Sequence, residues 1–137
     1  MIHLRSILVD YVAFIRDFEN SLKEKYSIDV NPYCEAHRLG KVARKGTVGD
    51  YEYHYHGSGC SFTYKGIIGE FGVWIGRGKE IQFNEWGITQ FIETHPKYSG
   101  YSIDEDVLRA QIKEMVYADE LSMLELGGQW FEVYLIL

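Results

Sequence analysis

The sequence has few cysteines, few basic side chains and no long apolar run. Among its 137 residues only Cys34 and Cys60 are cysteines, and they follow no CxxC spacing. Two cysteines cannot build a disulfide framework, so we expect a reducing, cytoplasmic environment. The N-terminal stretch is interrupted by charges and no segment approaches the length of a bilayer span, so we expect neither a signal peptide nor contact with a membrane.

Basic residues are outnumbered by acidic ones, 14 to 20, which gives a net charge of −6. Nucleic-acid affinity comes largely from lysine and arginine at phosphates, so no direct nucleic-acid partner is expected. A basic protein partner would instead be attracted to the chain. The alternative is that the acidity only aids solubility.

A recognised catalytic signature is also missing. Gly76-Arg77-Gly78-Lys79 lacks the GK[ST] ending of a phosphate loop and is interpreted as a turn. We therefore predict no enzyme, no catalytic residue and no cofactor.

What the chain does contain is the pattern of one folded domain, residues 1–137. Hydrophobic residues make up 46% of it and aromatic residues 15%, which is enough for a well-packed core. Apolar residues recur at helical spacing in the first part of the chain, and alternation with period two begins near Asp50. The predicted helices cover residues 2–26, 31–40 and 84–94, and a further one begins at a Ser102/Glu105 capping box and extends irregularly to 126; the predicted strands cover 51–56, 60–65, 67–75 and 129–137.

This order of elements predicts an α+β fold. We expect an antiparallel sheet of about four strands, formed by the central meander and the C-terminal strand, with N-terminal and C-terminal helices packed against it. A parallel α/β sheet would require regular alternation of strands and helices, which the pattern lacks.

The densest group of reactive side chains lies in the segment from Tyr51 to Cys60. If residues 57–59 form a three-residue turn, His56 lies opposite Cys60, and His54 shares their face of the hairpin. Imidazole and thiolate are ligands that zinc prefers, so His54, His56 and Cys60 form an alternative metal site, with Glu52 or Glu70 as further donors. A Cys60–His56 nucleophilic pair oriented by an acid is a second alternative.

Two other groups are candidates for binding a partner. The acidic residues Glu114, Asp119, Glu120 and Glu125 could together form a patch that meets a basic protein, or only a solvated face. Tyr51, Tyr53 and Tyr55 share the other face of the first strand, where they are either core residues or interface anchors. We expect the three tryptophans to belong to the core.

One stretch combines a histidine-containing aromatic strand, a His-Gly-x-Gly-Cys turn and a later tryptophan helix. Within Lys45 to Pro96 the matching residues are Gly46, Tyr53, His54, Phe71, Trp86 and the run His56-Gly57-Ser58-Gly59-Cys60. In these features the chain resembles a small bacterial domain family of unknown function. It departs from the family pattern at Gly69-Glu70-Phe71-Gly72, where aspartates tend to alternate with aromatics and Glu70 is the one acid.

Members that stand alone look like the immunity proteins of contact-dependent inhibition and related toxin systems. The resemblance implies a small cytoplasmic protein that binds and blocks one cognate toxin domain, here a basic one such as a nuclease. Glu114, Asp119, Glu120 and Glu125 would pair with basic residues of the toxin, and Tyr51, Tyr53 and Tyr55 would anchor it. Metal binding or metal-dependent catalysis at His54, His56 and Cys60 is the alternative.

Overall fold

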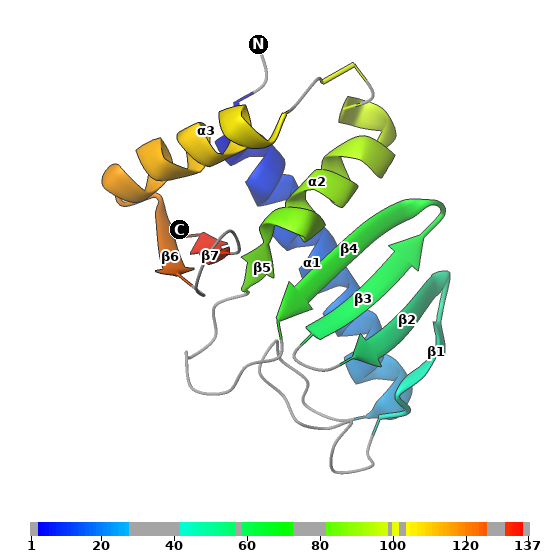
Figure 1. The fold of residues 1–137 in the computed structure, drawn as a ribbon. Coiled ribbons are helices and arrows are strands. Elements are labelled where there is room, and N and C mark those ends of the chain that lie inside the picture. Colours follow the sequence, from blue (N-terminus) through cyan, green and yellow to red (C-terminus); the bar gives the residue numbers. More distant parts are fainter. Residues whose placement is uncertain are drawn as a thin grey trace.

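The computed structural model describes residues 3–27, 42–56, 59–72, 82–98, 100–101, 104–125 and 131–135. Helices and strands follow one another along this part of the chain without a repeating unit (Figure 1). They are α1 (Leu4–Tyr26), β1 (Lys45–Val48), β2 (Tyr51–His56), β3 (Gly59–Tyr64), β4 (Ile67–Gly72), β5 (Phe83–Asn84), α2 (Glu85–Thr94), the 3-10 turn η1 (Pro96–Tyr98), α3 (Glu105–Tyr117), β6 (Leu121–Glu125) and β7 (Phe131–Leu135).

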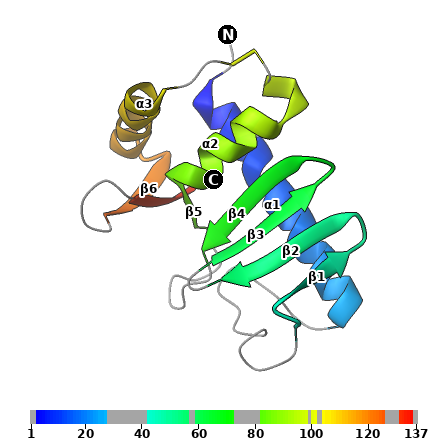
Figure 2. The ribbon, with the colours of Figure 1, turned by 45° about the vertical axis from the view of Figure 1, so that its right-hand side comes forward.

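The strands form two antiparallel sheets. The first is a meander in the order β1-β2-β3-β4, and the second has the order β5-β7-β6. Helix α1 lies across one face of the meander, while no described helix covers the opposite face (Figures 1 and 2). Helix α2 packs along β4, and α3 packs against β6.

Aromatic side chains form the core between α1 and the meander. Strand β2 alternates strictly, with its tyrosines buried and Glu52 and His54 exposed, as expected for a sheet with one covered face. Phe18 of α1 stacks on Phe62 of β3 with ring centroids 4.3 Å apart. Gly69 of β4 makes room for that ring, because a Cβ at this position would lie 2.5 Å from Phe62 Cζ.

The outer edge of β4 is closed by side chains and loop backbone rather than by another strand. The buried Tyr11 hydroxyl donates to Glu70 O at 2.6 Å and accepts from Glu70 N at 2.9 Å. Thr94 Oγ1 accepts from Ile68 N at 2.9 Å, and Gln82 O accepts from Gly72 N at 2.8 Å. These bonds satisfy an edge that would otherwise be open to pairing with another chain.

The predicted α+β class is confirmed, as is an antiparallel sheet of four strands. Helix α1, the three strands of the central meander and helix α2 occur close to their predicted positions, and Asn84 caps α2 through a 2.8 Å bond from Gly87 N. The predicted helix over 31–40 lies outside the described residues.

Three details of the prediction are wrong. The fourth strand of the meander sheet is β1, while the C-terminal strand β7 pairs with β5 and β6 in the second sheet. The helix predicted to extend to 126 ends at Tyr117, and residues 121–125 form β6 because β7 supplies a hydrogen-bonding partner. The cap of α3 is Asp104, whose carboxylate accepts from Val107 N at 2.9 Å, instead of Ser102.

Candidate functional site

The β2–β3 hairpin has a register that separates the predicted metal ligands. His56 pairs with Gly59, Tyr55 with Cys60 and His54 with Ser61, so the connection is two residues long and not three. A shift of one residue moves a side chain to the other face of a sheet. Cys60 therefore lies on the tyrosine face, and the two histidines lie on the opposite face.

Cys60 belongs to the core. Its side chain is fully buried, and burial raises the pKa of its thiol well above the usual value, with the charges of Glu70 and Glu19 acting in the same direction. A protonated buried thiol is a poor nucleophile and a poor metal ligand. Within the described ranges no group of three or more His, Cys, Asp or Glu side chains could hold a metal ion. The predicted His54/His56/Cys60 site is thus wrong in its geometry.

The tyrosines of β2 also face the core. Tyr51, Tyr53 and Tyr55 are 3–5% exposed. The Tyr51 hydroxyl hydrogen-bonds to Asp17, and Tyr53 bonds to the Tyr26 hydroxyl at 2.7 Å and donates to a backbone carbonyl. The prediction that these three rings anchor a partner is wrong, because α1 covers their face of the sheet.

The prediction that the tryptophans belong to the core is wrong for Trp86. Its side chain, in the first turn of α2, is 41% exposed. Trp74 and Trp130 lie outside the described residues.

A polar chain on the other face of the hairpin was not predicted. His56 Nε2 and Ser61 Oγ are 2.7 Å apart, Ser61 Oγ lies 3.4 Å from Glu70 Oε2, and Asn84 Nδ2 donates to Glu70 Oε1 at 3.0 Å. The order differs from that of a catalytic triad, in which the imidazole lies between hydroxyl and carboxylate. Since Asn84 is also the cap of α2, this chain connects the meander to the start of that helix. Only the strand register brings Ser61 beside His56, and no sequence motif marks it.

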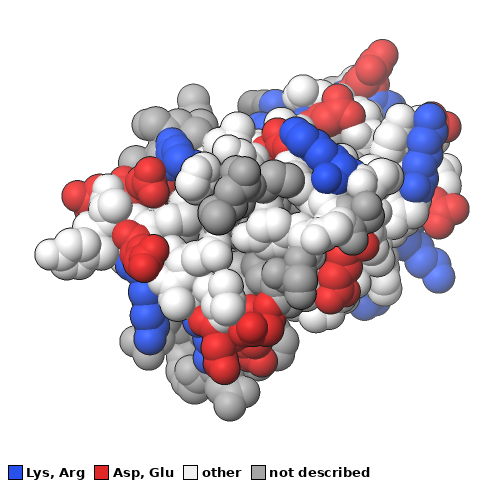
Figure 3. All heavy atoms as spheres, turned by 90° about the horizontal axis from the view of Figure 1, so that it is seen from above, with Lys and Arg blue, Asp and Glu red and all other residues white. Residues whose placement is uncertain are grey.

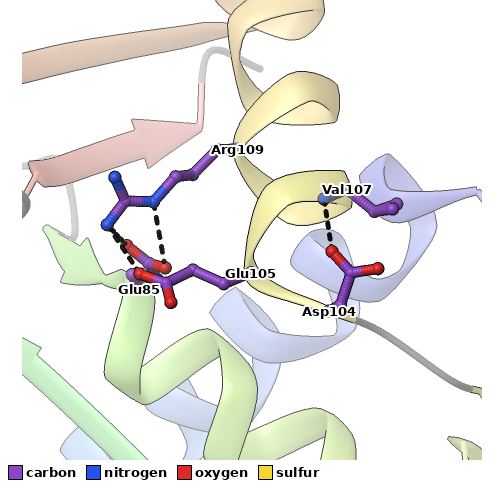
Figure 4. A network of polar contacts seen from close by, with 5 residues as sticks. All are labelled: Glu85, Asp104, Glu105, Val107 and Arg109. Carbon is purple, nitrogen blue, oxygen red and sulfur yellow. Dashed lines mark hydrogen bonds and ion pairs between the residues drawn. The ribbon is translucent and has the colours of Figure 1, made fainter.

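The acidic residues at the start of α3 have structural partners. Arg109 Nη2 lies 3.2 Å from Glu85 Oε2 and 2.8 Å from Glu105 Oε1. Figure 4 shows these three side chains together on one side of α3, while Asp104 caps the helix on its other side. The hydrogen bond to Glu85 raises the pKa of Arg109. The ion pair between Arg109 and Glu85 joins α3 to α2. The positive end of the helix dipole stabilises the negative charges of Asp104 and Glu105.

The acidic residues at the other end of α3 are placed differently. We call Glu114, Tyr117, Asp119 and Glu120 the acidic corner. The last turn of α3 contains no basic residue, and Asp119 adopts a left-handed conformation with φ of 57°. Tyr117 is 93% exposed. Glu120 Oε1 lies 4.0 Å from Arg5 Nε, while Glu114 and Asp119 form no ion pair with any described residue.

The segment that contains the corner carries most of the net charge. Residues 104–125 include seven acidic and two basic side chains, a net charge of −5 out of −6 for the whole chain. Seen from above, acidic side chains lie on the side of the molecule that α3 forms, and further acidic and basic side chains are spread over the rest of this face (Figure 3). Glu125 contributes to this sum from β6, although its side chain lies outside the described part of the structure. The predicted acidic patch therefore has three described members close together in sequence, Glu114, Asp119 and Glu120.

A groove adjoins the acidic corner. It encloses about 770 Å³ between the first turn of α1 and one side of α3, and both Glu114 and Glu120 line it. Its other lining residues are those of the first turn of α1 with its N-cap His3, Tyr101, and residues of α3 with its C-cap Ala118. Sequence periodicity could not show this groove, because it depends on how α1 and α3 cross.

Among the described residues no helix has the length and apolar character needed to cross a membrane.

Comparison with known proteins identifies the family but no relative of known activity. Neither the curated proteins nor the solved structures include a significant match to the chain. One family model, the domain of unknown function DUF6896, matches residues 4–132, so the chain belongs to that family.

Proposed function

We propose that the protein is a binding protein of the immunity type, whose acidic corner binds a basic toxin domain and blocks its active surface. The observation that carries the proposal is the group of negative charges at the C-terminal end of α3, where the helix dipole disfavours them. Acidic side chains near a helix C-terminus oppose the helix dipole, at a cost of roughly 0.3–1 kcal/mol each. Residues that destabilise their own helix and form no compensating contact are expected at functional sites.

Tyr117 supports the same surface. A tyrosine that is 93% exposed gains nothing from the core of its own protein. Tyrosines are enriched among the residues that dominate binding energy at protein interfaces, because they bury a large area and keep a polar tip. At the corner, Tyr117 would supply apolar contact area, while Glu114, Asp119 and Glu120 supply charge.

The proposed mechanism is occlusion. Surfaces that bind phosphate backbones are rich in lysine and arginine, and a cluster of carboxylates would pair with those cations. Such charges mainly increase the association rate and select the partner, and salt weakens their effect. A nuclease domain is therefore the favoured class of toxin. A cytoplasmic location remains part of the proposal.

The test uses the product of the gene that lies directly upstream of the gene for this protein, which the proposal requires to contain a toxin domain. We expect the triple variant Glu114→Lys/Asp119→Lys/Glu120→Lys to lose protection against growth inhibition and to bind the isolated toxin domain at least about 100-fold more weakly in calorimetry. The matched control is Glu24→Lys/Glu93→Lys, which reverses two exposed acids on α1 and α2 and should leave both measurements unchanged.

Unaltered protection by the folded triple variant would refute the corner as the binding surface. The absence of binding between the wild-type protein and the neighbouring gene product would refute an immunity role toward it.

A further inference from the structure

The groove beside the acidic corner combines carboxylates with apolar surface, a combination that suits a long cationic side chain. Two carboxylates lie on its walls, Glu114 on α3 and Glu120 just beyond the end of that helix. Apolar surface comes from Met115, from Val107, which is 43% exposed, and from Tyr101. An arginine or lysine combines the two matching parts, an apolar stem and a charged head.

Of the two carboxylates, Glu114 is the one available to a ligand. Glu120 is already near a cation, since its Oε1 lies 4.0 Å from Arg5 Nε. Glu114 is exposed and forms no ion pair within the described part of the chain. A cation in the groove would therefore pair with Glu114 rather than with Glu120, beside which the like charge of Arg5 already lies.

The aromatic wall distinguishes arginine from lysine. A guanidinium is planar, stacks on aromatic rings and matches a carboxylate with two parallel N–H donors, whereas an ammonium is a compact, strongly hydrated point charge. Tyr101 is partly buried and offers such a ring at the groove. A volume of about 770 Å³ also exceeds the needs of one side chain, so it admits the flanking backbone of a peptide segment.

We propose that the groove receives an arginine side chain of the basic partner, with the guanidinium paired with Glu114 and stacked on the Tyr101 ring and with its stem against Met115. This inference rests on the proposed function and names the chemistry by which the partner is recognised. It places one partner arginine in the groove while Tyr117 and Asp119 contact the surface around it.

The test uses three capped tripeptides as probes: Gly-Arg-Gly, Gly-Lys-Gly and Gly-citrulline-Gly, the last a neutral analogue of the first. Binding to the full chain is followed by NMR through the Met115 methyl group and the Gln111 side-chain amide, both of which line the groove. We expect saturable shifts with the arginine peptide, weaker binding of the lysine peptide and none of the citrulline peptide. Glu114→Gln should weaken the binding of the arginine peptide by up to about fivefold, the upper limit for an exposed ion pair, and Glu93→Gln should not.

Equal shifts with the arginine and citrulline peptides, or no shift with any peptide, would overturn the inference. This result is separable from the fate of the proposed function, which Asp119→Lys tests, since Asp119 does not line the groove. If Asp119→Lys abolishes toxin binding while no peptide enters the groove, only arginine binding in the groove is refuted. If the arginine peptide binds and the toxin interaction is insensitive to the corner, only the function is refuted.

Discussion

At the scale of single residues, Glu19 is the least expected feature of the core. Its side chain on α1 is 2% exposed, and its Oε1 lies 3.5 Å from Arg16 Nη1. Its Oε2 accepts no hydrogen bond from any residue that the structure describes. Burial raises the pKa of Glu19 to about 7, and the positive charges of Arg16 and Lys23 offset only part of this effect. A carboxylate without adequate partners in an apolar site is destabilising in its charged form.

Glu19 should make the stability of the protein depend on pH. The ordinary pKa of 4.5 applies to the unfolded chain, so between pH 4.5 and 7 the folded state binds more protons. The contribution of Glu19 to stability is therefore complete below pH 4.5 and declines as the pH rises through 7, by about 3 kcal/mol in total. Glu19→Gln, which cannot ionise, should gain stability relative to wild type between pH 5 and pH 8.

Urea unfolding at the two pH values measures this difference. The exposed Glu24→Gln is the control, and it should track the wild type at both values. A free-energy difference between Glu19→Gln and wild type that is the same at pH 5 and pH 8 would contradict the prediction.

At the scale of elements, both ends of α3 carry acidic residues, but the helix dipole acts on them in opposite directions. Asp104, Glu105 and Asp106 stand at its N-terminus, where the helix dipole favours negative charge. Asp119 follows its C-terminus, where the dipole disfavours it. Asp119 has a left-handed backbone conformation, which both aspartate and asparagine tolerate. Replacing Asp119 by asparagine therefore changes the charge without changing the backbone strain.

Neutralising these two ends should therefore change stability in opposite directions. We expect Asp119→Asn to stabilise the protein and Asp106→Asn to destabilise it, each by about 0.3–1 kcal/mol at low ionic strength. Both effects should shrink in 1 M salt, where charges are screened within about 3 Å. Thermal unfolding at low and high salt measures them, and the same sign for the two variants would show that the dipole does not govern this helix.

At the scale of the whole molecule, the Tyr11 hydroxyl connects α1 to the meander at the point where α2 also approaches. A Cβ at Gly87 of α2 would lie 2.5 Å from that hydroxyl and 3.4 Å from Glu70 O, so only glycine allows the three elements to come this close. Alanine is the better helix former in isolation, by about 1 kcal/mol. The packing of the whole molecule thus overrides local helix propensity at this position.

Tyr11→Phe should weaken the fold as a unit. The ring would stay between Phe83 and Phe91, with centroid distances of 5.4 and 4.7 Å, but the amide and carbonyl of Glu70 would lose their partner. An unsatisfied buried polar group costs about 1–3 kcal/mol, so we expect a loss of about 2 kcal/mol or more. Urea unfolding measures the loss, and hydrogen exchange at Glu70 N locates it.

The exposed Tyr117→Phe provides the matched control and should unfold like the wild type. Equal stability of Tyr11→Phe and wild type would mean that water replaces the hydroxyl at the β4 edge.

Patterns of local origin allowed much of this structure to be predicted. The apolar spacing of α1, the alternation in β2 and the Asn84 cap depend on neighbours within a few residues, and all three occur as predicted. The three acidic residues of the corner were also recognisable, since charge is a property of the sequence itself, whereas the exposed Tyr117 was not predicted. Its relation to the groove was not, because the walls come from helices about a hundred residues apart.

The sequence by itself determined the fold class, the charge of the α3 segment and the alternation of the β2 side chains. Only the tertiary structure decided which face of β2 is buried, since a pattern of period two specifies two faces but not which one meets α1. It also decided the hairpin register, and a single residue of turn length moved Cys60 away from His54 and His56. Residues 121–125 became a strand through pairing with β7, a contact between segments that local preferences do not encode.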